Sequence, residues 1–175
     1  MKTIALRGKK AAGRVVLIDD EDWPLVTSYP WWLIESKRKN GSLRGPYAHT
    51  EFRRDDGRLI KPYMHSLITG WPMTDHINHD GLDNQRSNLR PATYAQNLHN
   101  QRLRDSGSSR YKGVCWHRRG GKWQAGLTID SRYIYLGLYA REEEAALAYN
   151  TAALEAFGAY ACLNPVDGKP DVPAA

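Results

Sequence analysis

In the last third of the chain, apolar and polar residues alternate in three runs. Alternation at every second position is the period of strands that bury one face. Gly120-Gly121 and Asp130-Ser131 separate the runs and are typical of tight turns. The pattern therefore predicts a three-stranded antiparallel sheet. The apolar positions expected to face its core are Val114, Trp116, Trp123, Ala125, Leu127, Ile129, Ile134 and Leu136.

The period changes to that of a helix directly after Ala140. The stretch REEEAALAYNTAALEAFG has three acidic residues in its first turn, where they suit the helix dipole, and ends on Gly158, a typical helix stop. We therefore expect one amphipathic helix to pack across one face of the sheet. The tail from Asn164 contains three prolines and is expected to be disordered.

The first third of the chain has the punctuation of a small antiparallel sheet. Short runs of strand-forming residues alternate with turn clusters that contain glycine, and the large aromatic residues Trp23, Trp31 and Trp32 are expected to pack in its core. The runs cover residues 14–18, 31–34, 47–52 and 59–64, and the turns residues 39–41 and 55–57.

Between these zones, the chain has the order strand, loop, strand, helix. We expect residues 74–77 to form a strand with a polar end and residues 79–86 to form a loop rich in turn formers. Residues 88–92 are expected to form a second strand, in which Pro91 is tolerable at an edge. Thr93 then caps a helix that begins at Tyr94.

The length and composition suit two small modules. The chain has 175 residues, of which 41% are hydrophobic, as in globular proteins. A polar Gly/Ser stretch at 105–109 has the composition of a linker. We therefore expect a first domain at 1–104, a second at 110–163 and a tail at 164–175.

The charge and the cysteine count narrow the possible partners. A formal net charge of +6 favours anionic partners such as nucleic acid. Cys115 and Cys162 form no CxxC pair, so neither a zinc site nor a disulfide framework is indicated. The sequence lacks a membrane-spanning run and a signal peptide, which predicts an intracellular protein that does not bind membranes.

Three residues of the middle zone have the chemistry that phosphodiester hydrolysis needs. Asp75 and Asn97 carry oxygen ligands of the kind that Mg²⁺ prefers. The imidazole of His76 has an ordinary pKa of ~6.5, which suits a general base. Because Asp75 and His76 are adjacent, a regular strand points them to opposite sides, and a twist or bulge is needed to bring them together.

The same zone resembles the HNH homing-endonuclease family of phages and introns. The resemblance is carried by DHINHDGLDNQRSNLR and the following QN pair, and it covers residues 63–101. It implies a ββα-metal (His-Me finger) core at 63–104, with His76 as the general base and Asp75 and Asn97 as ligands of Mg²⁺ or Mn²⁺. Asn88 belongs to the same catalytic set and pins the loop to the hairpin.

Other polar residues of this zone have two possible roles. His65 either supports the site or contacts DNA, or simply packs, while His79 is expected to be a loop residue. Arg86, Arg90 and Arg102 are candidates for phosphate contacts, and the alternative is solvated surface charge.

The C-terminal segment is similar to the ethylene-response-factor, or APETALA-two, type of DNA-binding domain. The similarity is carried by YKGV, GKWQAGL, YLGLY and EEEAALAYNTAALEAFG, and it implies binding of double-stranded DNA by the sheet in the major groove. Gly113 and Gly126 would allow close approach to DNA. The chain departs from the plant pattern at Cys115, Gly126 and Thr128, which removes any inference about the plant recognition sequence. The expected DNA-binding residues are Arg110, Lys112, His117, Arg118, Arg119, Lys122, Gln124, Thr128, Arg132 and Tyr135.

Together these features predict an α+β protein in which a small sheet with a ββα core precedes a three-stranded sheet packed on one helix. The predicted function is a monomeric DNA endonuclease of the mobile-element type, without a small-molecule cofactor, in the cytoplasm of a bacterial or phage-infected host. The alternative is a non-catalytic, sequence-specific transcription regulator, suggested by the C-terminal segment alone. An RNA-binding module is disfavoured because no aromatic platform with the usual signature is present.

Overall fold

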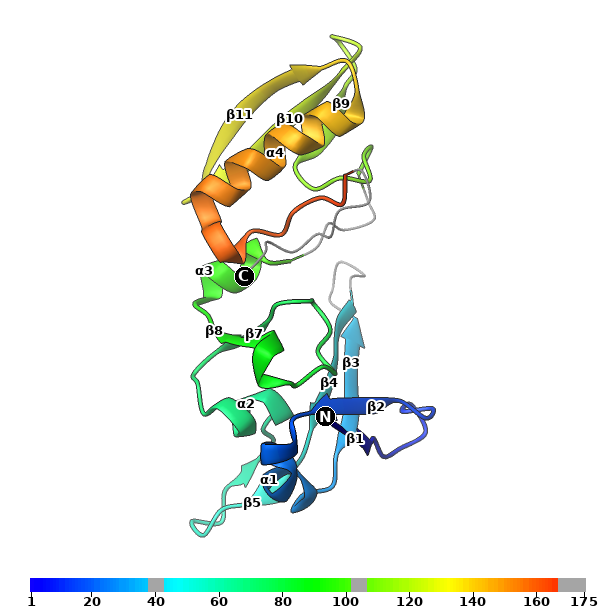
Figure 1. Ribbon diagram of the computed structural model, residues 1–175, viewed down its shortest axis with the longest axis vertical. Helices are drawn as coiled ribbons and strands as arrows, with labels where there is room; N and C mark the ends of the chain where they lie inside the picture. Colours follow the sequence, from blue (N-terminus) through cyan, green and yellow to red (C-terminus); the bar gives the residue numbers. More distant parts are fainter. Residues whose placement is uncertain (38–42, 102–106, 167–175) are drawn as a thin grey trace. The chain divides into compact units, whose positions relative to one another are not determined.

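The computed structural model describes residues 1–37, 43–101 and 107–166, and it divides the chain into two compact units, Met1–Thr93 and Tyr94–Ala175 (Figure 1). The α+β class is confirmed. The division falls before the helix that begins at Tyr94, whereas the sequence placed the boundary at 105–109. Residues 105 and 106 of that predicted linker lie outside the described residues, as does the predicted turn at 39–41.

Three separate strand pairs replace the single small sheet that the sequence suggested for the first zone, and the separately predicted strands β7 and β8 form a fourth pair. The pairs are β1 with β2, β3 with β4, β5 with β6 and β7 with β8, all antiparallel. Short strands with different neighbours pack around one core instead of forming a continuous ladder. The strands are β1 (Lys2–Ala5), β2 (Val15–Ile18), β3 (Trp32–Lys37), β4 (Leu43–His49), β5 (Phe52–Arg53), β6 (Leu59–Ile60), β7 (Thr74–His76) and β8 (Leu89–Pro91).

Two short helices that the sequence did not predict complete this unit. Helix α1 (Trp23–Thr27) has Pro24 in its first turn, a position where the missing N–H costs nothing. Helix α2 (Met64–Thr69) ends at Gly70 in the left-handed conformation, so the predicted strand at 59–64 stops at Ile60. Two 3₁₀ turns, η1 (Asp20–Asp22) and η2 (Arg86–Asn88), lie before α1 and before β8.

The core of the N-terminal unit is built around Trp31, which is 1% exposed. Its indole N–H donates to the carbonyl of Val26 at 2.7 Å, so the buried donor is paired. Trp23 and Trp32 are half-buried, and Trp23 packs against this core. The prediction that the tryptophans pack in the core is thus fully confirmed for Trp31 and partly for Trp23 and Trp32.

The C-terminal unit contains the three strands and the helix that the sequence predicted. After α3 (Tyr94–His99), the sheet has the order β11-β10-β9 and is antiparallel throughout. Helix α4 crosses one face of it (Figure 1). The helix ends at Gly158, as predicted. The other elements are β9 (Val114–His117), β10 (Lys122–Ile129), β11 (Arg132–Tyr139), α4 (Glu142–Phe157) and η3 (Gly158–Tyr160).

A β-bulge breaks the predicted alternation in β11. The register shifts between Ala125 and Gly126, so that Leu136 is the extra residue on β11. Leu136 packs into the core, but Ile134 is 40% exposed. The expectation that Ile134 is buried was wrong: the residue lies opposite buried Leu127, on the face that α4 covers, but it belongs to the edge strand β11 and stays exposed.

Gly113 and Gly126 serve packing within the domain and not the approach to DNA that the sequence suggested. A Cβ on Gly113, which has a φ of +74°, would lie 2.0 Å from the ring of Tyr149. A Cβ on Gly126 would lie 2.1 Å from the hydroxyl of Tyr133. Both side-chain positions are filled by rings of the same unit.

The start of the predicted disordered tail is ordered. Asn164 and Val166 are 5% and 3% exposed. The amide of Asn164 accepts from the backbone N–H of Lys112 at 2.6 Å and donates to its carbonyl at 2.9 Å. Residues 167–175 lie outside the described part. Across the described ranges, no helix combines the length and apolar character needed to cross a membrane.

Replacing Gly113 by alanine tests the contact between sheet and helix. We expect Gly113→Ala to lower the free energy of unfolding of the C-terminal unit by about 2–4 kcal/mol, because it adds overpacking to left-handed strain. Gly121→Ala is the matched control: its φ is +57° but nothing lies within 4 Å, so only the strain of about 1–2 kcal/mol remains. Urea unfolding measures both, and equal losses would contradict the packing argument.

Candidate functional site

The strand pair β7–β8 places Asp75 directly opposite Arg90. The Nε and Nη2 atoms of Arg90 lie 2.8 and 2.7 Å from the Oδ2 atom of Asp75. The side chains are 13% and 4% exposed, so this is a nearly buried, charge-assisted pair. Arg90 thus orients the carboxylate of Asp75, and neither alternative in the sequence analysis, a phosphate contact or a solvated charge, describes it.

His76 is 6% exposed and lies among aromatic rings. Its ring centroid is 5.0 Å from that of His65 and 5.9 Å from that of Tyr47. Burial lowers the pKa of His76, against opposing effects from the Asn84 hydrogen bond and nearby carboxylates. The imidazole is therefore held neutral, the form that can accept a proton.

The side chain of Asn84 lies beside one ring nitrogen of His76. Its Oδ1 atom lies 3.5 Å from the Nε2 atom of His76, and the side chain of Asn84 is fully buried. An acceptor oxygen beside Nε2 favours the tautomer with the proton on that nitrogen, in which Nδ1 is the basic nitrogen. The sequence analysis did not select Asn84, although it lies within the DGLDN segment that it quoted.

Asn88 holds the loop between β7 and β8 against the hairpin. Its Oδ1 atom accepts from the backbone N–H of Asn78 at 2.9 Å, and its Nδ2 atom donates to the carbonyl of Asp83 at 2.8 Å. These contacts are of the kind expected for Asn88. Within the loop, Asn78 and Asp80 accept from backbone N–H groups two residues ahead. Polar residues that resemble catalytic candidates in the sequence therefore form hydrogen bonds that stabilise the loop.

The far end of the same loop is tied to the start of the chain. The guanidinium of Arg86 donates to the buried carboxylate of Asp22 at 3.0 and 2.7 Å. The backbone N–H of Arg86 donates to Asp19 at 2.8 Å, and Asn84 and Leu17 are joined by a backbone hydrogen bond. Arg86 therefore anchors the loop, and its predicted phosphate contact stays a prediction. Arg102 lies outside the described residues.

The predicted metal ligands belong to different units. Asp75 lies on β7 of the N-terminal unit, whereas Asn97 is half-buried on α3 of the C-terminal unit. Among the described residues, no group of three His, Cys, Asp or Glu side chains gathers into a cluster that could hold a metal. A carboxylate can accept at both oxygens, so the pairing of Asp75 with Arg90 is compatible with a hard cation.

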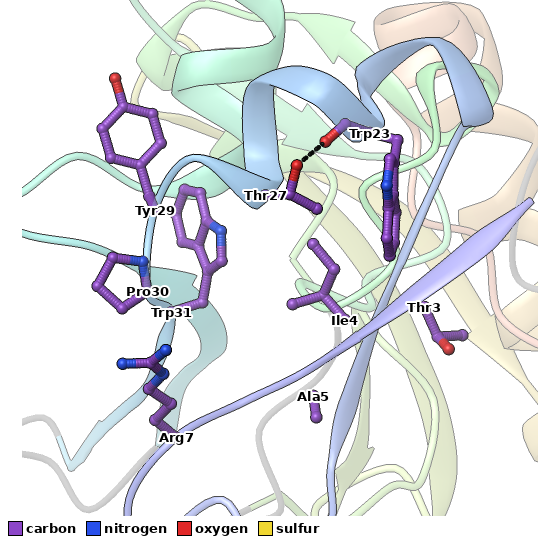
Figure 2. A pocket seen from close by; sticks show the side chains of 9 residues that line it. All are labelled: Thr3, Ile4, Ala5, Arg7, Trp23, Thr27, Tyr29, Pro30 and Trp31. Atoms are coloured by element: carbon purple, nitrogen blue, oxygen red, sulfur yellow. Dashed lines mark hydrogen bonds between the residues drawn. The ribbon is translucent and has the colours of Figure 1, made fainter.

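A cavity of about 270 Å³ lies elsewhere in the N-terminal unit (Figure 2). Figure 2 shows the rings of Trp23, Tyr29 and Trp31 around it, with Arg7 at one side. None of the predicted nuclease residues lines this cavity. The candidate site is therefore identified by the side chains of Asp75 and His76 on β7, and not by this cavity.

The face of the C-terminal sheet opposite α4 carries several of the predicted DNA-binding residues. The register pairs Cys115 with Gln124, His117 with Lys122 and Gly126 with Tyr135 across the strands. The same face carries Tyr133 and Leu138, which the sequence analysis missed. Tyr133 is 57% exposed and accepts from the amide of Gln124 at 2.9 Å. Tyr133 could have been found by alternation from Tyr135, but Leu138 follows the bulge and could not.

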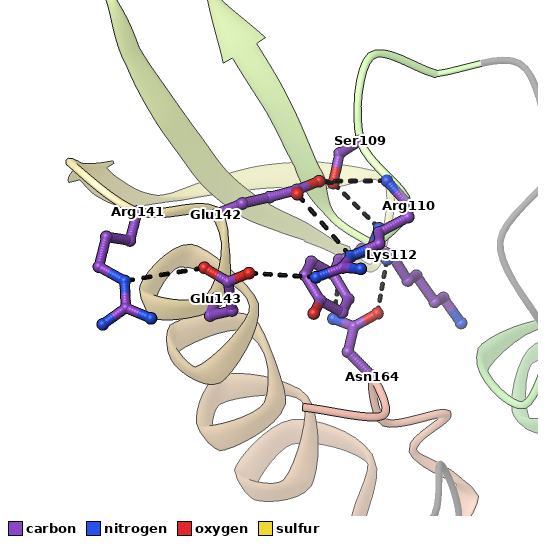
Figure 3. A network of polar contacts seen from close by, with 8 residues as sticks. Ser109, Arg110, Lys112, Arg141, Glu142, Glu143 and Asn164 are labelled. Carbon is purple, nitrogen blue, oxygen red and sulfur yellow. Dashed lines mark hydrogen bonds and ion pairs between the residues drawn. The ribbon is translucent and has the colours of Figure 1, made fainter. Parts of the chain in front are cut away.

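Three of the predicted DNA contacts point elsewhere. The ammonium of Lys112 donates to the carbonyls of His99 and Gln101 at 2.6 and 2.7 Å, so it is not on the open face. The guanidinium of Arg110 lies 3.1 Å from Glu143 at the start of α4 (Figure 3). Arg132 pairs with Ile129, on the face that α4 covers.

The remaining predicted contacts are accessible. Arg118 and Arg119 are exposed in the turn between β9 and β10, and Lys122 is exposed at the start of β10. Thr128 and Tyr135 are exposed on the open face. This face therefore combines neutral, partly aromatic strands with a basic turn.

The pH dependence of stability tests the burial of His65. Burial, with the nearby His76, lowers the pKa of His65 to about 3. Below an ordinary pKa of ~6.5 the unfolded chain takes up a proton that the folded chain does not, so this stability is complete above that pH and falls by ~1.4 kcal/mol per pH unit below it. We expect His65→Phe to lose about 2 kcal/mol less than the wild type between pH 7 and pH 5 in urea unfolding. Identical pH dependence would contradict this.

The chain is similar to two groups of known proteins, although no family model matches it. An AP2-like ethylene-responsive transcription factor of Arabidopsis thaliana is 47% identical over 60 residues, which cover 33% of this chain and 17% of that factor. A second ethylene-responsive factor of that plant is 40% identical over 146 residues, 77% of this chain and 32% of the factor. The chain thus spans a third or less of these plant proteins.

The other similarity extends over nearly the whole chain. An uncharacterized HNH endonuclease of Acanthamoeba polyphaga mimivirus is 31% identical over 175 residues, which cover 94% of this chain and 81% of that protein. The aligned region therefore includes both parts of the chain: the Asp75–His76 pair on β7, and the three-stranded sheet and helix α4 that follow it in the sequence. The chain belongs to the HNH endonuclease family.

Proposed function

We propose that the protein is a DNA endonuclease that hydrolyses phosphodiester bonds with His76 as general base. The observation that carries the proposal is the pair Asp75–His76 on β7: one side chain is a buried carboxylate oriented by Arg90, and the other a buried, neutral imidazole. Membership of the HNH family supports the same chemistry.

In the proposed reaction, His76 removes a proton from a water molecule as its oxygen attacks phosphorus. The bond from phosphorus to the 3′ oxygen breaks, and this oxygen takes a proton from solvent water, which leaves a 5′-phosphate and a 3′-hydroxyl end. Asn84 keeps the imidazole in the tautomer whose Nδ1 atom accepts the proton. Asn88 and the loop that it pins hold the hairpin in this arrangement.

One divalent cation, Mg²⁺ or Mn²⁺, would be held by Asp75 and Asn97. When bound, such a cation supplies charge stabilisation for the developing phosphorane. Both residues offer oxygen donors, which suits a hard cation. Arg90 would keep the carboxylate of Asp75 oriented for this role.

Double-stranded DNA is the proposed partner, and the C-terminal sheet is its proposed contact surface. The similarity to plant DNA-binding factors and the basic turn of Arg118 and Arg119 both support this assignment. The neutral face between them suits contacts with base edges and methyl groups more than with phosphates. A mobile-element role as a monomer is part of the proposal.

Cleavage of supercoiled DNA that carries the locus around this protein's own gene tests the proposed nuclease activity. We expect relaxation or linearisation by the wild type with Mg²⁺, and none with EDTA. His76→Ala should slow the reaction by about 10²–10⁴-fold with unchanged DNA affinity, since only the base is lost. His79→Asn is the matched control, because His79 has a φ of +66°, which asparagine tolerates. Equal activity of His76→Ala and the wild type would sink the assignment.

The salt dependence of binding tests the basic turn. Replacing Arg118 and Arg119 together by alanine should weaken DNA binding and lower the slope of log K against log [salt] by up to about 2, because two phosphate contacts are lost. Arg132→Ala removes one charge from the opposite face and should change the slope little. Fluorescence anisotropy at several salt concentrations measures both slopes. A larger effect of Arg132→Ala would contradict the proposal that DNA contacts the face opposite α4.

A non-catalytic transcription regulator is the second candidate, favoured by the similarity to plant transcription factors. A regulator would bind DNA through the same sheet but would have no use for Asp75, His76 and Asn97. The absence of cleavage by the wild type, together with sequence-specific binding, would favour this function.

A further inference from the structure

A lysine caps the carbonyl end of α3. The last carbonyls of a helix have no partner within it and need donors from elsewhere. The Nζ atom of Lys112 donates to the carbonyl oxygens of His99 and Gln101, at 2.6 and 2.7 Å. A positive charge is also favourable at this end of a helix. Lys112 therefore caps α3 from a segment that comes after it in the chain.

Lys112 is itself fixed by a series of amide contacts. Asn164 grips the backbone of Lys112 at both its N–H and its carbonyl, while the side chain of Lys112 extends away from Asn164 (Figure 3). Asn150 of α4 in turn accepts from the N–H of Asn164 at 2.7 Å and donates to its carbonyl at 2.9 Å. The cap on α3 is thus connected to the main helix of the C-terminal unit.

A ring contact holds α3 at a second point. The imidazole of His99 stacks on the ring of Phe157, the last residue of α4, with centroids 3.8 Å apart and an angle of 16° between the planes. A helix of six residues is not stable alone, so contacts such as these stabilise it within the C-terminal unit. Asn97 is on this helix.

We propose that Lys112 is a positioning residue of the nuclease: by capping α3 it fixes the helix that carries Asn97. This inference rests on the proposed function, in which Asn97 is a ligand of the cation. It also replaces the DNA contact that the sequence predicted for Lys112. Loss of a residue that orients a metal ligand typically weakens metal affinity by about 10–100-fold.

The test compares Lys112→Met, which keeps the length of the side chain but removes its donor, with Lys122→Met in the full chain. For Lys112→Met we expect faster hydrogen exchange at the amides of residues 98–101 and a rise of about 10–100-fold in the Mg²⁺ concentration for half-maximal cleavage. The rate at saturating Mg²⁺ and the DNA affinity in EDTA should stay within about twofold. Lys122→Met should show the reverse: weaker DNA binding with unchanged exchange and Mg²⁺ dependence. Lys112→Arg should restore much of the wild-type behaviour, since it retains a cationic donor.

The outcomes separate the inference from the function on which it rests. Unchanged exchange at 98–101 in Lys112→Met would overturn the cap. Faster exchange with unchanged Mg²⁺ dependence, or a loss of DNA affinity like that of Lys122→Met, would overturn the positioning role. Loss of cleavage at all Mg²⁺ concentrations, with the thermal transition of the C-terminal unit also lost and Lys112→Arg inactive, would show a general folding defect and count against it. Faster exchange beside a wild type that never cleaves would instead overturn the proposed nuclease.

Discussion

Pairing of buried polar groups is the constraint on which both units of this protein depend. A buried charge or amide without a partner costs several kcal/mol, whereas a paired one can orient its neighbours. The loop between β7 and β8 shows the consequence, because Asn88 ties it to the hairpin and Arg86 ties it to Asp22. The same constraint gives Asp75 its partner Arg90. The geometry of the candidate site follows from these pairs.

In the C-terminal unit, the constraint acts through amides and one lysine. Asn150, Asn164 and Lys112 form a connected set that ends on the carbonyls of α3. Close packing also stabilises this unit, because Gly113 leaves the space that the ring of Tyr149 fills. The sheet can therefore expose its opposite face without losing its core, and that face offers Tyr133 and Tyr135 to solvent.

The burial of His76 has a chemical consequence. A histidine near the surface would be partly protonated near neutral pH, but desolvation lowers the pKa of His76 and keeps it neutral. His65 and Tyr47 form the surrounding wall, and both come from elements remote in the sequence. The neutral state of His76 thus depends on the side chains that pack around the short strands β7 and β8.

The sequence by itself determined the order of the elements and the periodic parts of the fold. Alternation, turn residues and helix ends are local properties, and they predicted β7, β8, β9, β10, β11, α3 and α4. The DH pair and the flanking motif identified the candidate site for the same reason. Only the tertiary structure decided which long polar side chains meet one another: Lys112 turns to α3, Arg110 to α4, and Arg86 and Arg90 to carboxylates. A lysine or arginine has several rotatable bonds, so its partner depends on which elements pack beside it. The bulge that brings Leu138 to the open face likewise depends on pairing between strands.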